Sequence, residues 1–255
     1  MKLGLKDKRV LVTGSSKGIG YAIAERFLLE NAKVYITSRS KINLLKSSKK
    51  IAAIGLENNA SFIKTDFRKS SSINNLKKVL MKKDKGLDIL VVNIGDGSGS
   101  KKELLEEKLW NKSWDINFKT AINAVQKFLP LINKSRGTIL FISSIAGKES
   151  IGAPIAYATA KSAISSFSKN LSRVNTNIRV NTIAPGNIYF EGGSWDKKIK
   201  KNKKQIFNNI KKIVPVKRFG KPGEVASAAI FLCSDEAKFI NGSTLVIDGG
   251  QTVSI

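Results

Sequence analysis

A tyrosine and a lysine four positions apart, Tyr157 and Lys161, are the residues best suited to proton chemistry. On a helix, residues at i and i+4 share one face. A free phenol has a pKa near ~10, and a lysine cation at ~4–5 Å favours its phenolate by roughly 3–4 kcal/mol, an upper bound of two to three pKa units. We therefore predict that Lys161 lowers the pKa of Tyr157 and that Tyr157 exchanges a proton with substrate near neutral pH.

The chain has no histidine. This absence removes Ser-His-Asp and Cys-His catalysis and every zinc site that needs imidazole, so we predict no metal centre. Ser144 follows an apolar run at 138–143, upstream of the Tyr157–Lys161 pair. Its hydroxyl would hydrogen-bond a substrate oxygen on which charge develops.

A glycine-rich segment, Thr13–Gly20, reads Thr-Gly-Ser-Ser-Lys-Gly-Ile-Gly and lies between an apolar run and a helical pattern. The glycines let the backbone approach a pyrophosphate, and the start of a helix supplies unpaired N–H groups. We predict a dinucleotide site in this strand–turn–helix context, in preference to a glycine turn without a ligand. The predicted contacts are Gly14, Ser16, Lys17, Gly18, Ile19 and Gly20.

The end of the second predicted strand bears on the choice of cofactor. An enzyme that prefers NAD places a carboxylate there for the ribose 2′-hydroxyl. This chain has Ser38-Arg39-Ser40 instead. Arg39, together with Lys17, would meet a 2′-phosphate; the alternative is that both are exposed cations of a lysine-rich protein. We predict NADP(H) in preference to NAD(H).

Short apolar runs alternate with helical patterns along the whole chain, which is typical of βαβ units and a parallel sheet buried on both faces. We predict a single-domain α/β Rossmann fold over 1–255, a doubly wound sheet of about seven strands with helices on both faces. The predicted strands are 9–13, 33–37, 61–64, 89–93, 138–143, 178–183 and 243–247. The predicted helices include 19–30, 72–83, 114–131 and 157–174.

One excursion, residues 187–214, interrupts this alternation; we call it the lid segment. An apolar stripe at helical spacing runs from Trp195 to Ile213, and lysines occupy the opposite face. The stripe predicts one amphipathic helix, and a long excursion between strands is commonly a lid over an active site. The stripe is Trp195, Ile199, Asn202, Ile206, Ile210 and Ile213; the lysines are Lys197, Lys198, Lys200, Lys201, Lys203 and Lys204.

The formal charge is +26, from 45 basic and 19 acidic residues. Most of the basic residues are lysines, whereas arginine reads bases and phosphates better, so we favour solvated lysines over nucleic-acid binding. The charge also leaves room for an anionic substrate. The single cysteine, Cys233, excludes an internal disulfide and suits the cytoplasm. No apolar run has the ~20 residues of a membrane helix.

The chain resembles the short-chain dehydrogenase/reductase family over essentially its full length. The resemblance is carried, in chain order, by these residues: the Thr13–Gly20 loop, Asp66, Val92-Asn93-Ile94-Gly95, Asn117, Ser144, Tyr157-x-x-x-Lys161, Pro185-Gly186 and Asp248-Gly249-Gly250. It implies that Tyr157 is the general acid/base, that Lys161 lowers the Tyr157 pKa and binds the nicotinamide ribose, and that Ser144 positions the carbonyl.

The resemblance also implies a water-holding role for Asn117 in a proton relay and contacts from Asp66 to the adenine. Other implied cofactor contacts are Asn93, Gly95, Pro185, Gly186 and Ile188. Family members are usually tetramers, so we expect a homotetramer or a dimer. Phe190 replaces the threonine usual in this family. Asp96, in the loop after Asn93, and Trp195 are candidate substrate contacts; Trp195 would either stack on a flat polar ligand or pack in the lid's own core.

Within the family, the pattern looks most like 3-oxoacyl-acyl carrier protein reductases, and a basic lid suits an acidic carrier protein. A substrate carried on coenzyme A or on a nucleotide is also compatible. The glycine-rich loop after Asn93 and the entrance to the lid suit a sugar or nucleotide-sugar instead. A non-enzymatic protein that binds a dinucleotide or nucleic acid is the remaining class, and the Ser144–Tyr157–Lys161 set argues against it.

Overall fold

The computed structural model describes residues 2–99 and 106–254. Within these ranges the centre is a seven-stranded parallel sheet in the order β3-β2-β1-β4-β5-β6-β7. The strands are β1 (Arg9–Val12), β2 (Lys33–Ser38), β3 (Ala60–Lys64), β4 (Ile89–Val92), β5 (Thr138–Ile142), β6 (Arg179–Pro185) and β7 (Thr244–Ile247). The predicted single-domain, doubly wound Rossmann fold is confirmed, and the predicted strands agree with these bounds to within two residues.

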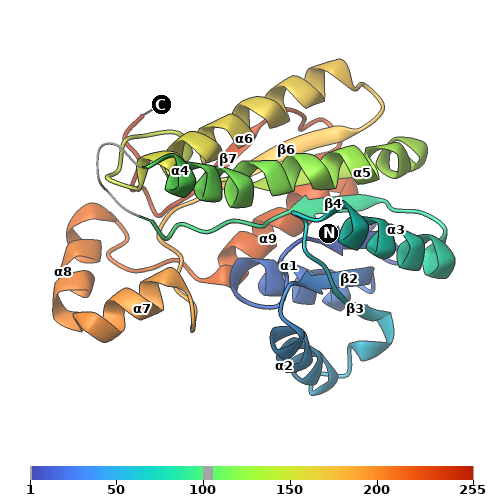
Figure 1. Ribbon diagram of the computed structural model, residues 1–255, viewed down its shortest axis with the longest axis horizontal. Helices are drawn as coiled ribbons and strands as arrows, with labels where there is room; N and C mark the ends of the chain where they lie inside the picture. Colours follow the sequence, from blue (N-terminus) through green and yellow to red (C-terminus); the bar gives the residue numbers. More distant parts are fainter. Residues whose placement is uncertain (1, 100–105, 255) are drawn as a thin grey trace.

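The strands contribute side chains to two apolar layers because successive side chains point to opposite faces of a sheet. Val10 and Val12 of β1 belong to one buried cluster, and Leu11 belongs to the other. The first cluster includes residues of α1 (Gly18–Leu29), α2 (Lys41–Ala52) and α9 (Pro222–Cys233). The second includes residues of α3 (Ser70–Asp84), α5 (Thr120–Ser135) and α6 (Ile155–Val174), and Figure 1 shows α5 and α6 crossing one side of the sheet.

The helix predicted over 114–131 differs from the structure in two ways. It is longer, because α4 (Glu107–Trp114) leads into it and α5 ends at Ser135. It is also irregular, since residues Asp115–Lys119 form a π-helical turn between α4 and α5. Such turns occur frequently at functional sites, and this one carries the buried Asn117.

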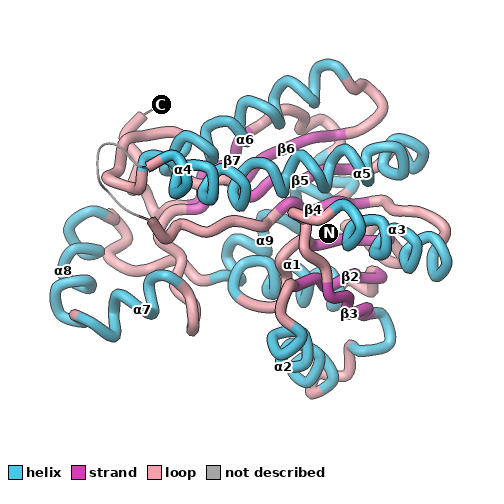
Figure 2. Tube along the Cα trace, viewed as in Figure 1, coloured by secondary structure: helices cyan, strands magenta, loops and turns pink. Residues whose placement is uncertain are grey.

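The lid segment forms two helices, not the single helix predicted from its apolar stripe. They are α7 (Ser194–Lys201) and α8 (Lys203–Ile213), separated at Asn202. Asn202 has an extended backbone, and its side chain caps α8 by accepting from the N–H of Gln205. The break folds the stripe on itself, and Ile210 and Val214 of the lid segment form a small core with Phe219, which follows the segment. Figure 2 shows α7 and α8 standing beyond one end of the sheet.

The strand order reverses at β1, which has β2 on one side and β4 on the other. In open α/β sheets, ligands bind beyond the carboxyl ends of the strands at such a reversal. The loops that follow β1, β4, β5 and β6 carry Gly14, Asn93, Ser144 and Gly186, respectively. The topology therefore brings the predicted site residues to one edge of the sheet. Across the described residues, no helix is both long and apolar enough to cross a membrane.

Candidate active site

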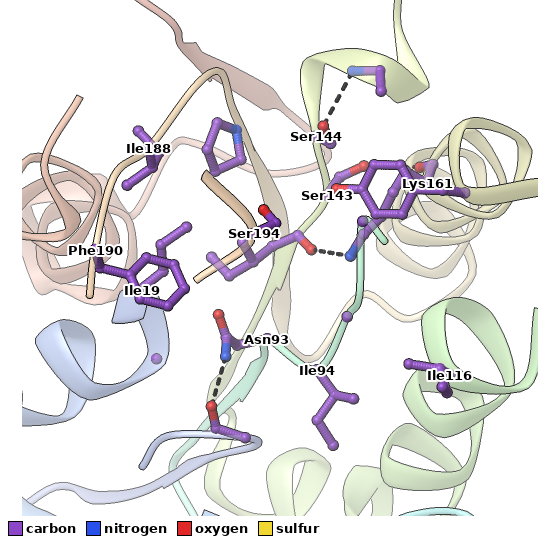
Figure 3. Close-up of a pocket in the computed structure, with 18 of the residues that line it drawn as sticks. Ile19, Asn93, Ile94, Ile116, Ser143, Ser144, Lys161, Ile188, Phe190 and Ser194 are labelled. Carbon is purple, nitrogen blue, oxygen red and sulfur yellow. Dashed lines mark hydrogen bonds between the residues drawn. The ribbon is translucent and has the colours of Figure 1, made fainter. Parts of the chain in front are cut away.

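A cavity of about 800 Å³ opens at this edge of the sheet (Figure 3). Its walls come from the loops after β1, β2, β3, β4, β5 and β6, from α6 and from the lid segment. The structure brings most of the predicted site residues together here. Those that line it are Gly14, Ser16, Lys17, Ile19, Gly20, Arg39, Asp66, Asn93, Gly95, Ser144, Tyr157, Lys161, Pro185, Gly186, Ile188 and Trp195. Gly18, Asp96 and Asn117 are not among the lining residues.

The glycine-rich loop has the backbone that an anion site requires. Gly14 and Gly18 adopt positive φ angles of 63° and 60°, a region that favours glycine. Helix α1 begins at Gly18 with Lys17 as its N-cap, and no side chain caps its first N–H groups. Those donors are therefore left for an anion such as a pyrophosphate.

Asn93 fastens this loop to β4. Its side-chain amide donates to the carbonyl oxygens of Thr13 (3.1 Å) and Gly14 (3.0 Å), and Figure 3 shows it between the loop and the cavity. A β-carbon at Gly20 would lie 2.5 Å from the Asn93 amide nitrogen and 2.6 Å from the Gly14 oxygen. Only glycine at position 20 allows this close packing of loop, helix and strand.

The lid segment touches the same loop. A β-carbon at Gly18 would lie 2.6–2.8 Å from the ring of Phe190, so the ring rests directly on that glycine. Lys17 donates to the carbonyl oxygen of Gly192 at 3.3 Å. Phe190, which stands where the family usually has a threonine, therefore packs the lid segment against the glycine-rich loop, and Figure 3 shows it beside Ile19.

One end of the cavity, formed by the loops after β1, β2 and β3, is lined by three cations and one carboxylate: Lys17, Arg39, Arg68 and Asp66. The Arg68 guanidinium holds Asp66 with two hydrogen bonds, from Nε at 3.0 Å and from Nη2 at 2.7 Å. This pairing lowers the pKa of Asp66 to about 2, and Arg39 also contributes to the lowering. Arg68 already binds both carboxylate oxygens of Asp66. Asp66 therefore does not neutralise the positive charges of Arg39 and Lys17. Sequence reasoning missed Arg68, although a cation two residues beyond Asp66 was a usable signal.

Tyr157, Ser144 and Lys161 meet at the opposite end. Tyr157 and Lys161 lie one turn apart on α6, and the Lys161 Nζ is 5.9 Å from the centroid of the tyrosine ring. Lys161 is buried and donates to the carbonyl oxygen of Ile142 at 2.9 Å. Burial lowers the pKa of Lys161 to about 8.

The pKa of Tyr157 moves in the direction opposite to the prediction. Burial raises it, a hydrogen bond with the Ser144 hydroxyl opposes the rise, and the Asp96 carboxylate adds to it. Desolvation of the phenol has a larger effect on the Tyr157 pKa than the charge of Lys161 has. The Lys161 ammonium points to the Ile142 carbonyl, and its own lowered pKa means that it loses its proton more readily. The ring of Tyr157 is therefore a neutral phenol at neutral pH, which suits a proton donor.

Asn117 and Asp96 lie together behind the cavity. The Asn117 side chain accepts from the Asp96 N–H (2.8 Å) and donates to the Asp96 carbonyl oxygen (3.1 Å) and to the Ser113 carbonyl oxygen (3.0 Å). The Asp96 carboxylate is exposed and accepts from the Ser98 N–H. Asp96, predicted as a substrate contact, thus acts on Tyr157 through its charge, and Asn117 holds the loop that carries it.

Trp195 occupies the core position that was one of the two alternatives from the sequence, and its side chain also lines the cavity. It packs against Phe219 in the lid's own core, with ring centroids 5.2 Å apart. Lys198, placed with the solvent-facing lysines by sequence, lines the cavity too, with its Nζ 4.4 Å from the centroid of the Trp195 ring. The i, i+3 spacing of the two residues was the signal for this. The other lining residues that sequence reasoning missed include Asn187, Asn209 and Gln251.

Among the described residues, no group of three or more histidine, cysteine, aspartate or glutamate side chains could hold a metal ion. The arrangement instead pairs an anion-binding loop with a tyrosine, a serine and a lysine. Such a set can bind a dinucleotide and pass a proton to an oxygen placed between Ser144 and Tyr157.

Comparisons with known proteins agree with this geometry. The model of a family described as enoyl-(acyl carrier protein) reductase matches residues 14–252. The chain is 34% identical to glucose 1-dehydrogenase 2 of Bacillus subtilis, over 98% of this chain and 96% of that protein. It is 32% identical to an NAD-dependent glycerol dehydrogenase of Listeria innocua, over 98% of this chain and 95% of that protein.

Among solved structures, L-sorbose reductase from Gluconobacter frateurii, complexed with NADPH and L-sorbose, is similar with a TM-score of 0.92. The sequence identity is 28%, and the similarity covers 100% of both chains.

Proposed function

Since the chain belongs to the short-chain dehydrogenase/reductase family, whose members are oxidoreductases of alcohols and ketones that bind NAD(P)(H), we propose that it interconverts a ketone and a secondary alcohol with NADP(H). The observation that carries the proposal is the convergence of Ser144, Tyr157 and Lys161 on a cavity that also contains the glycine-rich loop. The neutral phenol of Tyr157 is the proton donor in the direction of reduction.

The chain's residues fit the dinucleotide at both ends. The uncapped N-terminus of α1 receives the pyrophosphate, and Arg39 and Lys17 receive the 2′-phosphate. Arg68 supports them by neutralising Asp66, which remains positioned for the adenine. Lys161 lies at the end expected to hold the nicotinamide ribose. When bound, the nicotinamide supplies a hydride to the carbonyl carbon, or accepts one from the alcohol.

The protein's own part in the reaction is the proton. Ser144 donates a hydrogen bond to the carbonyl oxygen, and Tyr157 transfers its phenolic proton to that oxygen as the carbon is reduced. The phenolate left behind is stabilised by Lys161 and regains its proton from water. Asn117 keeps the Gly95–Gly97 backbone in place and acts as a positioning residue.

Two substrate classes are compatible with the proposed reaction, and the screen below distinguishes them. The basic lid segment supports a 3-oxoacyl thioester on an acidic carrier, and the description of the matching family also names an acyl carrier protein. The names of three similar proteins, which act on glucose, glycerol and L-sorbose, support a sugar or polyol. We propose that a screen of acetoacetyl thioesters and keto-sugars, with NADPH oxidation followed at 340 nm, separates the two.

The decisive variant is Tyr157→Phe, which removes one oxygen atom and with it the proton. We expect kcat on the best substrate of the screen to fall by about 10²-fold or more. Tyr21→Phe, on α1 and outside the lining of the cavity, is the matched control and should keep the parental rate. A Tyr157→Phe enzyme with the parental rate would sink the mechanism.

Cofactor preference is tested by binding. We expect NADPH to bind more tightly than NADH, and Arg39→Ala to weaken NADPH by about ten-fold while changing NADH little, since a charge-assisted contact contributes roughly 1.5–3 kcal/mol. The relative named as NAD-dependent makes this comparison necessary. Tighter binding of NADH would overturn the preference.

We also propose that the enzyme is a cytoplasmic homotetramer. The support for assembly is the family resemblance, and the support for location is the lone buried thiol of Cys233. Sedimentation velocity should give a species of four times the 27.8 kDa chain mass. A monomer at micromolar concentration would refute the assembly.

A further inference from the structure

Two amide side chains meet in the wall of the cavity, at the same end as Ser144. Asn187 donates a hydrogen bond from its amino group to the side-chain oxygen of Gln251 at 2.7 Å, and both residues line the cavity. Asn187 comes from the loop after β6, and Gln251 comes from the segment after β7. Ser144 follows β5, and β5, β6 and β7 are neighbours in the sheet. The amide pair therefore lies far from the loops after β2 and β3, which carry Arg39 and Asp66.

The backbone around Gln251 is held by two carboxylates. Asp248 accepts from the backbone N–H (2.7 Å) and from the hydroxyl (2.8 Å) of Thr252. Glu149, which belongs to the loop after β5, accepts from the Val253 N–H at 2.9 Å. The C-terminal segment is thus tied both to the end of β7 and to the loop that carries the serine, so the Gln251 side chain starts from a fixed backbone.

The backbone of Asn187 is held as well. Its carbonyl oxygen accepts from the Gly220 N–H at 2.9 Å. A β-carbon at Gly186 would lie 2.7 Å from the β-carbon of Asp248, so the end of β6 packs directly against the segment that carries Gln251. Because both amides start from fixed backbones, little conformational entropy is lost when the pair binds a ligand.

The bond between the two amides leaves one acceptor and one donor for a ligand. Within the described residues, the Asn187 side-chain oxygen and the Gln251 amino group have no further hydrogen-bond partner. Turning both amides by half a rotation would exchange their roles and still leave one donor and one acceptor. A hydroxyl group both donates and accepts, so it satisfies the pair. A hydrocarbon satisfies neither group, and burying them unpaired costs free energy.

The lid segment and the residues before α6 complete the wall. Ser194 and Asn209 add neutral polar side chains to the lining, and Ile151, Pro154 and Ile213 add apolar surface. The apolar side chains suit the C–H groups of a short carbon chain, and the few polar ones suit its hydroxyls.

We infer that Asn187 and Gln251 bind hydroxyl groups of the substrate while Ser144 and Tyr157 hold its carbonyl oxygen. The inference rests on the proposed function and gives it a substrate class: polyhydroxy ketones and the polyols formed from them. The substrate hydroxyls donate to the remaining amide oxygen and accept from the remaining amide N–H. Asn187 and Gln251 are thus specificity-determining residues, and they disfavour 3-oxoacyl thioesters, whose acyl chains carry no hydroxyl.

Ketones that share a carbon skeleton and differ in their hydroxyls test this. Erythrulose is matched with butanone, and fructose with hexan-2-one. We expect kcat/KM with NADPH to be at least about 100-fold higher for the hydroxylated member of one pair, since a site that hydrogen-bonds a hydroxyl rejects the analogue without it. A hydroxyl beside a carbonyl also activates the carbonyl chemically, so variants must show that the ratio depends on the amides.

Gln251→Leu and Asn187→Leu each replace an amide by an apolar side chain of similar size. Each should lower the hydroxylated-to-unsubstituted ratio of kcat/KM by about ten-fold or more, and the double variant by little more, because the amides act as a pair. Gln205→Leu is the matched control: Gln205 also accepts from an asparagine, Asn202, at 2.9 Å, but neither residue lines the cavity. The control should keep the ratio, and both glutamine variants should keep the parental affinity for NADPH. Equal kcat/KM for both members of both pairs, or a ratio that survives in both amide variants, would overturn the inference.

A binding measurement covers the case in which no ketone turns over. With the protein saturated with NADP⁺, saturation-transfer NMR should detect sorbitol bound to the parent and to Gln205→Leu, with a several-fold weaker signal for Gln251→Leu. Equal signals for all three proteins, or none for the parent, overturn the inference. Turnover that requires Tyr157 but ignores hydroxyls and Gln251 refutes only this inference, whereas Gln251-dependent sorbitol binding without turnover of any ketone refutes only the proposed function.

Discussion

Lys161 is the residue at which function and stability oppose each other. Its ammonium is buried and donates to the carbonyl oxygen of Ile142, and burial lowers its pKa from 10.5 to about 8. A charge so placed costs folding free energy at neutral pH. The site retains it because the phenolate of Tyr157 needs a cation beside it during proton transfer.

This opposition gives a prediction for Lys161→Met. Because the folded-state pKa lies below the unfolded value, the unfolded chain binds more protons between about pH 8 and 10.5, and parental stability rises with pH across that window. We expect the variant to be inactive but about 1–2 kcal/mol more stable at pH 7, the gain vanishing above pH 10.5.

Thermal unfolding monitored from pH 7 to pH 10.5 measures this difference. Lys169→Met, an exposed lysine on the same helix, is the control and should show no gain that depends on pH. A Lys161→Met protein that is less stable than the parent at every pH would contradict the explanation.

Among the elements, the junction of β1, α1 and β4 is the most closely packed. A β-carbon at Gly20 meets both the Asn93 amide and the Gly14 carbonyl oxygen. We expect Gly20→Ala to cost about 1–3 kcal/mol by overpacking and to weaken NADPH binding, because the loop must shift. Chemical denaturation and NADPH titration measure the two effects.

Gly223 is the matched control for this substitution. It lies in the first turn of α9, and a β-carbon there meets nothing within 4 Å. Gly223→Ala should be neutral or slightly stabilising, since alanine restricts the unfolded chain. A Gly20→Ala protein as stable as Gly223→Ala would show that the close approach at the loop is unimportant.

The lid segment is held by a buried carboxylate. Asp196 accepts from the Gly192 N–H and from the Tyr189 hydroxyl, and it pairs with Lys200. We expect Asp196→Ala to free the Phe190–Gly193 turn from the glycine-rich loop, to speed amide exchange there by about ten-fold or more, and to raise KM for NADPH more than it lowers kcat.

Lys200→Gln separates the two contributions. It removes only an exposed partner of Asp196, and such ion pairs contribute little. The variant should behave almost as the parent does. If Lys200→Gln loosened the turn as much as Asp196→Ala, the hydrogen bonds to Gly192 and Tyr189 would not be what holds it.

At the scale of the whole molecule, the +26 charge is mostly a property of solvated lysines. We expect duplex DNA to bind only weakly, with a dissociation constant above about 1 µM at ~150 mM salt, without sequence preference, and with an affinity that falls steeply as salt is added. Fluorescence anisotropy with two unrelated oligonucleotides measures this. A nanomolar complex specific to one sequence would contradict it.

The strands and the site residues in the loops that follow them could be predicted from local features. Apolar runs such as Val10–Val12 and Ile139–Ile142 are long enough for a buried strand and too short for a helix, so their identity did not depend on distant residues. Gly14 and Ser144 could be placed because each follows such a strand, and Tyr157 and Lys161 because both lie in the first two turns of α6.

Other features depended on what distant segments bring together. The apolar stripe from Trp195 to Ile213 specified which face is buried, but only packing against Phe219 showed that the chain folds back at Asn202. Spacing indicated that Tyr157 and Lys161 are neighbours, yet the direction of the tyrosine pKa was set by the segments that desolvate both side chains.

The sequence by itself thus determined the elements and the identity of the reacting groups, because short-range periodicity and residue type suffice for both. The tertiary structure decided the protonation of Tyr157, the pairing of Arg68 with Asp66 and the turn of Lys198 into the cavity. The first depends on burial, and the other two depend on how side chains are turned toward the cavity; both are set only once the chain has folded.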